Sequence, residues 1–255
     1  MQKIIVLLST SLLLAHLSFS QQTDSIKRSL LLKGAVTVTN KGISFVPTFT
    51  LGKPAAIFNL SLGKRKLFVE PELRFSLKGR PWSYLFWVRY KVKNSGKFQL
   101  NVGTHLGLNH RYDSISINGT VSTTGLVVRR YLAGELAPNY FISKNVSIGG
   151  YYMYSRGIDK GTIKNTHFVT INSNISNIKL GGQFYARIAP QLYYLALDAR
   201  DGLFITSSFN LYKKNFPLSF QSIINKSLDT DIAGSTKFLW NVSLIYSFSK
   251  KYVQQ

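Results

Sequence analysis

The chain has 255 residues, with 32 lysines and arginines against 10 aspartates and glutamates, and it contains no cysteine. The formal charge of +22 favours an anionic partner, and the missing cysteines exclude disulfides, thiolate metal sites and thiol nucleophiles. Tyrosine and phenylalanine are plentiful while proline and acidic residues are scarce, which favours one β-rich domain.

The N-terminus has the pattern of a secretory signal peptide. Met1, Gln2 and Lys3 precede a mostly apolar run that ends near Leu17, and small residues follow it. We therefore expect a signal peptide over residues 1–20, cleaved after Ser20, and a single domain over residues 21–255. The apolar run is too short for a membrane helix, and no later segment is long enough. Export argues against nucleic acid as the anionic partner and leaves periplasmic, secreted and outer-membrane destinations open.

The rest of the chain alternates apolar and polar residues in runs separated by glycine, asparagine and lysine turns, as β-strands do. The candidate strands, in chain order, are residues 30–39, 43–51, 55–63, 67–77, 82–92, 98–108, 123–141, 146–154, 167–175, 183–197, 203–212, 218–226 and 238–248. We expect the longest loop over residues 109–120, with further loops over residues 156–164 and 227–236. Arg130 lies on the apolar side of its strand, which suggests a bulge or an interface position.

The last candidate, residues 238–248, has the clearest pattern. Its even positions are all apolar, with aromatic residues at both ends and aliphatic residues in the middle. Membrane-spanning strands have this arrangement, because aromatic rings prefer the two interfaces between water and lipid. Aromatic residues near the ends of several candidates extend the pattern: Trp82, Tyr90, Tyr154, Tyr212, Trp240 and Phe248.

These strands predict an all-β fold, an antiparallel transmembrane β-barrel. Strands of about ten residues cross a bilayer at a tilt, and only a closed sheet satisfies every backbone group in lipid. The number of candidates is odd, whereas single-chain bacterial barrels usually have an even number. Pro47 removes a backbone donor, so residues 43–51 are the least suitable wall strand. We expect about 12 strands, with about 10 or 14 as alternatives.

The signal peptide, the alternating strands and the ending WNVSLIYSF resemble bacterial outer-membrane β-barrel proteins. The resemblance covers the whole mature chain and implies the outer membrane of a Gram-negative bacterium, surrounded by lipid that includes lipopolysaccharide. It also implies that the barrel-assembly machinery reads the last strand, through Phe248 with support from Tyr246 and Trp240. The chain continues to Gln255, which departs from the pattern of a terminal aromatic residue.

Charged residues collect on the polar faces of the strands, which would line the barrel lumen. The basic members are Lys33, Arg74, Arg89, Lys91, Arg129 and Arg187, and the acidic members are Glu70, Glu72 and Glu135. The basic residues could line a path for anionic solutes. Alternatively, the glutamates and arginines pair across the lumen and close it, which would make a non-conducting structural or partner-docking barrel. Tyr151, Tyr185 and Tyr193 on the same faces could stack on sugars or simply fill space.

Basic residues also gather at alternate turns, around residues 64–66, 93–97, 144 and 213–214, and again at residues 250–251. Threading back from the last strand puts all of them at the periplasmic rim, near anionic headgroups.

Catalytic interpretations are weak, and we expect no enzyme. His167 and Asn165 face the lipid side without a convincing serine neighbour, and His105 and His110 lack the carboxylates of a metal site. No pattern in the sequence indicates a cofactor.

Overall fold

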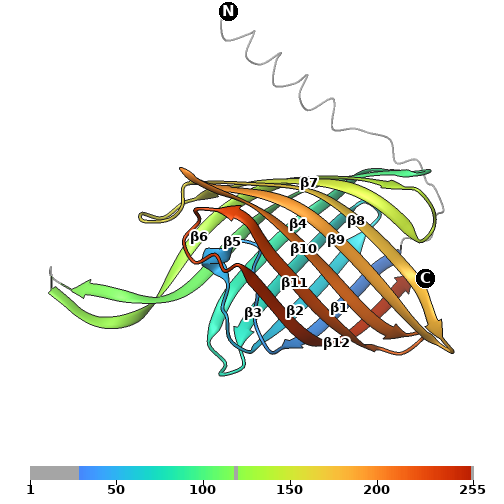
Figure 1. The fold of residues 1–255 in the computed structure, drawn as a ribbon, viewed down its shortest axis with the longest axis horizontal. Coiled ribbons are helices and arrows are strands. Elements are labelled where there is room, and N and C mark those ends of the chain that lie inside the picture. Colours follow the sequence, from blue (N-terminus) through green and yellow to red (C-terminus); the bar gives the residue numbers. More distant parts are fainter. Residues whose placement is uncertain (1–28, 118–119, 254–255) are drawn as a thin grey trace, which may run out of the picture. The chain divides into compact units, whose positions relative to one another are not determined.

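The computed structural model describes residues 29–117 and 120–253, so the predicted signal peptide and its cleavage site lie outside the described residues. Residues Ser29–Tyr252 form one compact unit. It is a closed antiparallel barrel in which every strand pairs with its neighbours in the chain, and β1 pairs with β12 (Figure 1). The predicted fold class is therefore confirmed.

The barrel wall has the following strands: β1 (Ser29–Thr39), β2 (Ala55–Lys64), β3 (Leu67–Ser76), β4 (Pro81–Ser95), β5 (Phe98–Ile117), β6 (Thr120–Phe141), β7 (Val146–Gly157), β8 (Asn165–Gly181), β9 (Phe184–Leu197), β10 (Arg200–Lys213), β11 (Leu218–Thr230) and β12 (Phe238–Val253). The expected total of about 12 is confirmed. Residues 43–51 form no wall strand, and a 3-10 turn, η1 (Pro47–Phe49), interrupts them as Pro47 suggests.

The two ends of the barrel differ in their connections. At the end where β1 begins and β12 finishes, the connections are residues 65–66, 96–97, 142–145, 182–183 and 214–217. We call this the turn end. The opposite end carries the longer connections, including residues 40–54, 158–164 and 231–237, and we call it the loop end. Short turns on one side and longer loops on the other are typical of outer-membrane barrels.

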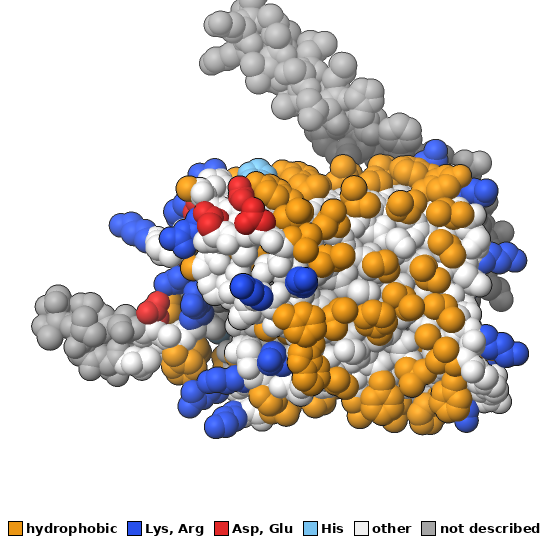
Figure 2. All heavy atoms as spheres, viewed as in Figure 1, with side chains coloured by type: hydrophobic (Ala, Val, Ile, Leu, Met, Phe, Trp, Pro, Cys, Tyr) orange, Lys and Arg blue, Asp and Glu red, His pale blue; other side chains and the backbone are white. Residues whose placement is uncertain are grey.

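The outer surface of the wall is apolar. Outward side chains of β12 such as Trp240, Leu244 and Tyr246 are exposed, while Asn241 and Ser243 on the other face are buried in the barrel. Figure 2 shows the apolar side chains as a broad band between two ends rich in lysine and arginine. A wall with this band suits contact with lipid rather than water. Within the described part of the chain, no helix is long and apolar enough to cross a membrane.

Three sequence predictions about the wall are wrong. The loop predicted over residues 109–120 is wrong, because residues 109–117 belong to β5, residue 120 begins β6, and the two strands stay paired beyond the other strands (Figure 1). Trp82 does not face outward: the pairing of β3 with β4 shifts register between Arg74 and Phe75, and Trp82 is only 3% exposed. Such an irregularity reverses the faces of the residues beyond it. Tyr212 also lies on the inner face, stacked on Tyr185 with a centroid distance of 6.0 Å.

The seam between the first and last strands has a close fit between a ring and a glycine. Phe248 of β12 covers Gly34 of β1, so that a Cβ atom at Gly34 would overlap the ring. At the loop end of the same seam, the Asn40 amide donates to the Val242 carbonyl at 3.1 Å. Phe248 therefore packs on the strand that closes the barrel.

Candidate functional site

The connection between β1 and β2, residues 40–54, folds into the lumen. Phe45 lies 6.1 Å from Phe168 and 5.7 Å from Tyr193 between ring centroids, and Phe49 lies 5.2 Å from Tyr131. These partners belong to β8, β9 and β6, on the inner wall. We call residues 40–54 the lumen loop.

Hydrogen bonds hold both ends of the lumen loop. The Trp82 indole Nε1 donates to the Phe49 carbonyl oxygen at 2.7 Å. The Gly42 amide donates to the Lys53 carbonyl at 2.8 Å, which closes the base of the loop. Val46 joins a buried cluster with Phe168, Tyr193, Leu195 and Phe204. The lumen at the loop end is thus partly filled by apolar and aromatic side chains.

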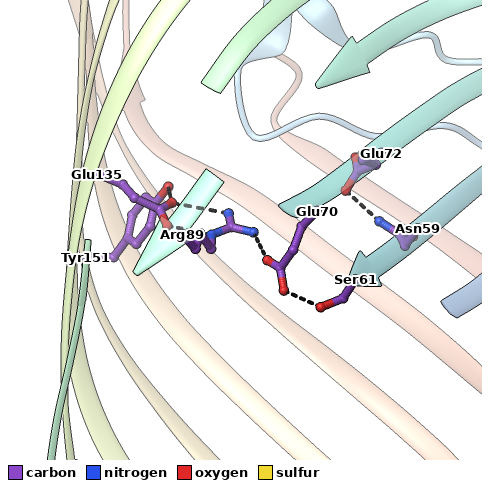
Figure 3. Close-up of polar contacts among 7 residues, drawn as sticks. All are labelled: Asn59, Ser61, Glu70, Glu72, Arg89, Glu135 and Tyr151. Atoms are coloured by element: carbon purple, nitrogen blue, oxygen red, sulfur yellow. Dashed lines mark hydrogen bonds and ion pairs between the residues drawn. The ribbon is translucent and has the colours of Figure 1, made fainter. Parts of the chain in front are cut away.

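A charged network runs along the inner wall, on neighbouring strands from β2 to β7. Arg89 on β4 binds two carboxylates, Glu135 at 2.6 Å and Glu70 at 2.6 Å (Figure 3). In the register of the sheet, Arg89 and Glu135 both lie beside Gly103 of β5, one on each side. A Cβ atom at Gly103 would lie 2.8 Å from a Glu135 oxygen and 3.0 Å from the Arg89 Cγ. Glycine therefore lets the ion pair bridge three strands.

Neutral donors complete the network. The Tyr151 hydroxyl donates to Glu135 at 2.7 Å, the Ser61 hydroxyl donates to Glu70 at 2.7 Å, and Asn59 donates to Glu72 at 2.7 Å. Arg74 pairs with Glu72 on the same strand. We call Glu70, Glu72, Arg74, Arg89 and Glu135 the lumen network. With two arginines against three glutamates, the network adds no net positive charge to the lumen.

Two cavities lie inside the barrel, and Glu72 and Arg89 of the lumen network line both of them. The first, of about 600 Å³, includes Phe45, Phe49 and Tyr131 of the loop-end half in its lining. The second, of about 620 Å³, includes Lys33, Ser61 and Ser247 nearer the turn end. Both cavities are lined by a common group of side chains: Asn59, Glu72, Trp87 and Arg89. Passage through the lumen would therefore lead past this group.

The other charged residues that the sequence places in the lumen lie apart from the network. Lys91 sits over the Phe68 ring at 4.3 Å, and Lys33 lines the second cavity. Arg187 donates to Asn174 on β8. Arg129 pairs with Asp113 at 2.9 Å in the long β5–β6 hairpin. The residues predicted as one cluster are thus divided among the middle of the barrel, the turn-end half and the long β5–β6 hairpin.

The basic turns lie together at the turn end, as the threading predicts. Their side chains are all exposed, and we call them the basic ring: Lys64, Arg65, Lys66, Lys93, Lys97, Lys144, Lys179, Lys213, Lys214, Lys250 and Lys251.

The odd position of Arg130 has an explanation at the loop end. Arg130 pairs with Asp159 of the connection 158–164 at 2.6 Å, and its backbone amide donates to the same carboxylate at 2.7 Å. The hydrogen bonds from Arg130 lower the pKa of Asp159 below its ordinary value. Arg130 therefore holds the connection 158–164 against β6.

His105 and His167 each lie against an aromatic side chain. His105 packs on the Trp87 ring with a centroid distance of 4.0 Å. The His167 Nδ1 lies 3.0 Å from the Tyr152 hydroxyl on the outer face. The described residues contain no group of three or more histidine or acidic side chains placed to hold a metal ion.

Sequence reasoning missed the lumen loop and the bridging role of Gly103. The apolar residues Phe45, Val46 and Phe49 around a proline were a usable signal for the loop, since an exposed connection rarely carries such side chains. The role of Gly103 follows only from the register of β4, β5 and β6.

Comparison with protein families and with curated proteins gives no match. Among solved structures, the chain is similar to the KdgM porin in complex with disordered oligogalacturonate, with 12% identity, a TM-score of 0.51, and coverage of 86% of this chain and 99% of that one. It is also similar to the NanC porin, with 13% identity, a TM-score of 0.46, and coverage of 89% and 100%. The β-domain of the Bordetella autotransporter BrkA gives 10% identity, a TM-score of 0.46, and coverage of 88% and 100%. The chain thus has the fold of the outer-membrane β-barrels.

Proposed function

We propose that the protein is a small outer-membrane channel or binding barrel that admits anionic solutes into its lumen. The observation that carries the proposal is the pair of stacked cavities, of about 600 and 620 Å³, inside a barrel with a lipid-facing outer wall. Each falls in the range of roughly 300–1,000 Å³ that is usual for small-molecule sites. The turn end faces the periplasm and the loop end faces outward, as in other outer-membrane barrels.

The charges that remain uncompensated favour an anionic solute. The lumen network pairs its arginines with glutamates, whereas Lys33 and Lys91 have no carboxylate within 4.0 Å among residues 29–117 and 120–253. Both lysines point into the turn-end half of the lumen, close to the basic ring. A low-dielectric wall strengthens the field of such cations and raises the local concentration of anions. The KdgM porin, which has this fold, was solved with oligogalacturonate, and that complex supports a barrel that takes up solutes.

Ion selectivity in planar bilayers tests this proposal. The wild-type barrel should conduct with a preference for chloride over potassium, and a Lys33→Glu and Lys91→Glu double variant should lower that preference several-fold. Lys144→Glu makes the same type of charge change on a turn outside the lumen and should have a smaller effect. A wild-type barrel that is folded but gives no conductance and no uptake of anionic solutes would contradict the proposal.

A second candidate is a non-conducting barrel, and the lumen loop together with the lumen network favours it. The loop fills part of the first cavity, and Arg89 links β3, β4 and β6 along the inner wall beside it. In that case conductance should appear only when the loop is released. The same bilayer recordings therefore separate the two candidates.

A further inference from the structure

We propose that the basic ring binds the phosphate groups of anionic phospholipids in the membrane leaflet at the turn end. The ring includes residues from four of the five turn-end connections, Lys179 near the end of β8 beside the fifth, and the last part of β12. It therefore surrounds the barrel instead of forming a patch on one side. A lipid annulus has this geometry, whereas a single docked protein or polymer would be expected to select one sector.

The acidic residues are placed so that they leave the ring uncompensated. Within the described ranges, no aspartate or glutamate lies on a turn-end connection. The described glutamates belong to the lumen network, and the described aspartates lie in the loop-end half of the barrel, where Asp113 and Asp159 pair with arginines. No ring side chain is among the ion pairs that the described residues form. The ring is thus free to bind external anions (Figure 2).

The ring lies next to aromatic side chains that face outward. The Lys66 Nζ lies 6.0 Å from the centre of the Tyr90 ring, and the Lys93 Nζ lies 5.7 Å from that of Phe98. Lys64, Leu67 and Tyr90 form one row across β2, β3 and β4, and Leu67 and Tyr90 are both exposed. Aromatic rings prefer the headgroup level, and lysine stems extend along apolar surface to bring the ammonium to the same level. Each lysine near anionic lipid adds attraction, and several around one barrel act together.

Fluorescence quenching by brominated lipids tests the proposal on the full chain in vesicles. A Tyr90→Trp variant places a reporter beside the ring, and the native Trp240 near the loop end reports on the other leaflet. Quenching by brominated phosphatidylglycerol should exceed quenching by brominated phosphatidylcholine several-fold at position 90, and by less at Trp240. Neutralising one lysine on each of four turns, with Lys64→Gln, Lys97→Gln, Lys144→Gln and Lys213→Gln, should abolish the difference at position 90.

A matched control changes the same number of exposed lysines at the loop end: Lys53→Gln, Lys78→Gln, Lys160→Gln and Lys237→Gln. This control should leave the selectivity at position 90 intact. Equal quenching by both lipids in the reporter barrel would overturn the proposal. A second result would also overturn the proposal: barrels that show no lipid selectivity but bind soluble polyglutamate through the basic ring. That result would assign the ring to an acidic polymer or protein. Neither outcome depends on conductance, so the test is independent of the proposed channel.

Discussion

Arg89 is the residue on which the lumen network depends. Its guanidinium compensates Glu70 and Glu135, and the Glu135 side chain is only 2% exposed. Arg89→Met would leave two carboxylates near each other with Tyr151 and Ser61 as neutral donors. Breaking a buried pair costs roughly 3–5 kcal/mol, and the partial exposure of Arg89 reduces this, so we expect a loss of about 2–3 kcal/mol in the free energy of unfolding. Urea unfolding of the barrel in vesicles measures it.

Arg129→Met is the matched control for Arg89→Met. Arg129 makes the same type of ion pair with Asp113, but the Asp113 side chain is 49% exposed. Exposed pairs contribute less than about 1 kcal/mol, so this variant should unfold nearly as the wild type does. Equal losses in the two variants would mean that burial of Glu135 does not control the stability of the network.

The sequence locates these residues but not their contacts. Alternation puts Glu70, Arg89 and Glu135 on inner faces, because each lies on the polar side of its own strand. Which of them meet depends on the register between strands and on Gly103, whose missing side chain leaves room for the bridge. Register is a property of pairs of strands, and a single strand's pattern does not contain it.

At the scale of elements, the lumen loop controls how much of the interior is free. Trp82→Phe keeps an aromatic ring but removes the hydrogen bond from Nε1 to the Phe49 carbonyl. A lost hydrogen bond costs about 1 kcal/mol, so the released state of the loop should become roughly fivefold more populated. Hydrogen exchange of the amides over residues 42–52 should accelerate by that factor, and single-channel recordings should show more frequent opening.

Trp240→Phe is the control for this variant, since Trp240 lies on the outer face, whereas Phe49 packs on the inner wall. It should leave exchange and conductance unchanged. If Trp82→Phe also changes neither, the loop is held by its contacts with Phe168, Tyr193 and Tyr131 alone.

An element can be predicted from the sequence where its own residues determine its structure. Pro47 marks the lumen loop because proline cannot donate to a sheet, and the alternation of β12 fixes its faces over eleven residues, 238–248. The polar residues of 109–120 favour a loop, but a hairpin that extends beyond the other strands can be polar on both faces. Trp82 lies beyond a register shift that its own strand does not reveal.

At the scale of the whole molecule, closure depends on the seam between β1 and β12, where the two ends of the barrel chain meet. Every other pair of neighbouring strands is joined by a short or medium connection, so its partners are close from the start. The seam must instead bring together strands from opposite ends of the sequence, and loop closure over that length has an entropic cost. Specific contacts such as Phe248 on Gly34 therefore help define the closed register.

The contact between Phe248 and Gly34 predicts that the effect of Gly34→Ala on stability changes sign when Phe248 is removed, which a double-mutant cycle measures. Gly34→Ala in the wild type should destabilise the barrel by about 1–3 kcal/mol, because the new Cβ overlaps the Phe248 ring. In a Phe248→Ala background the same substitution should be neutral or stabilising by up to about 1 kcal/mol, because the space is then free and alanine restricts the unfolded chain. Phe220→Ala removes an outward ring from β11 and should leave the cost of Gly34→Ala unchanged. Urea unfolding in vesicles gives the four free energies for each cycle. Additive values at Gly34 and Phe248 would show that the ring does not hold the seam.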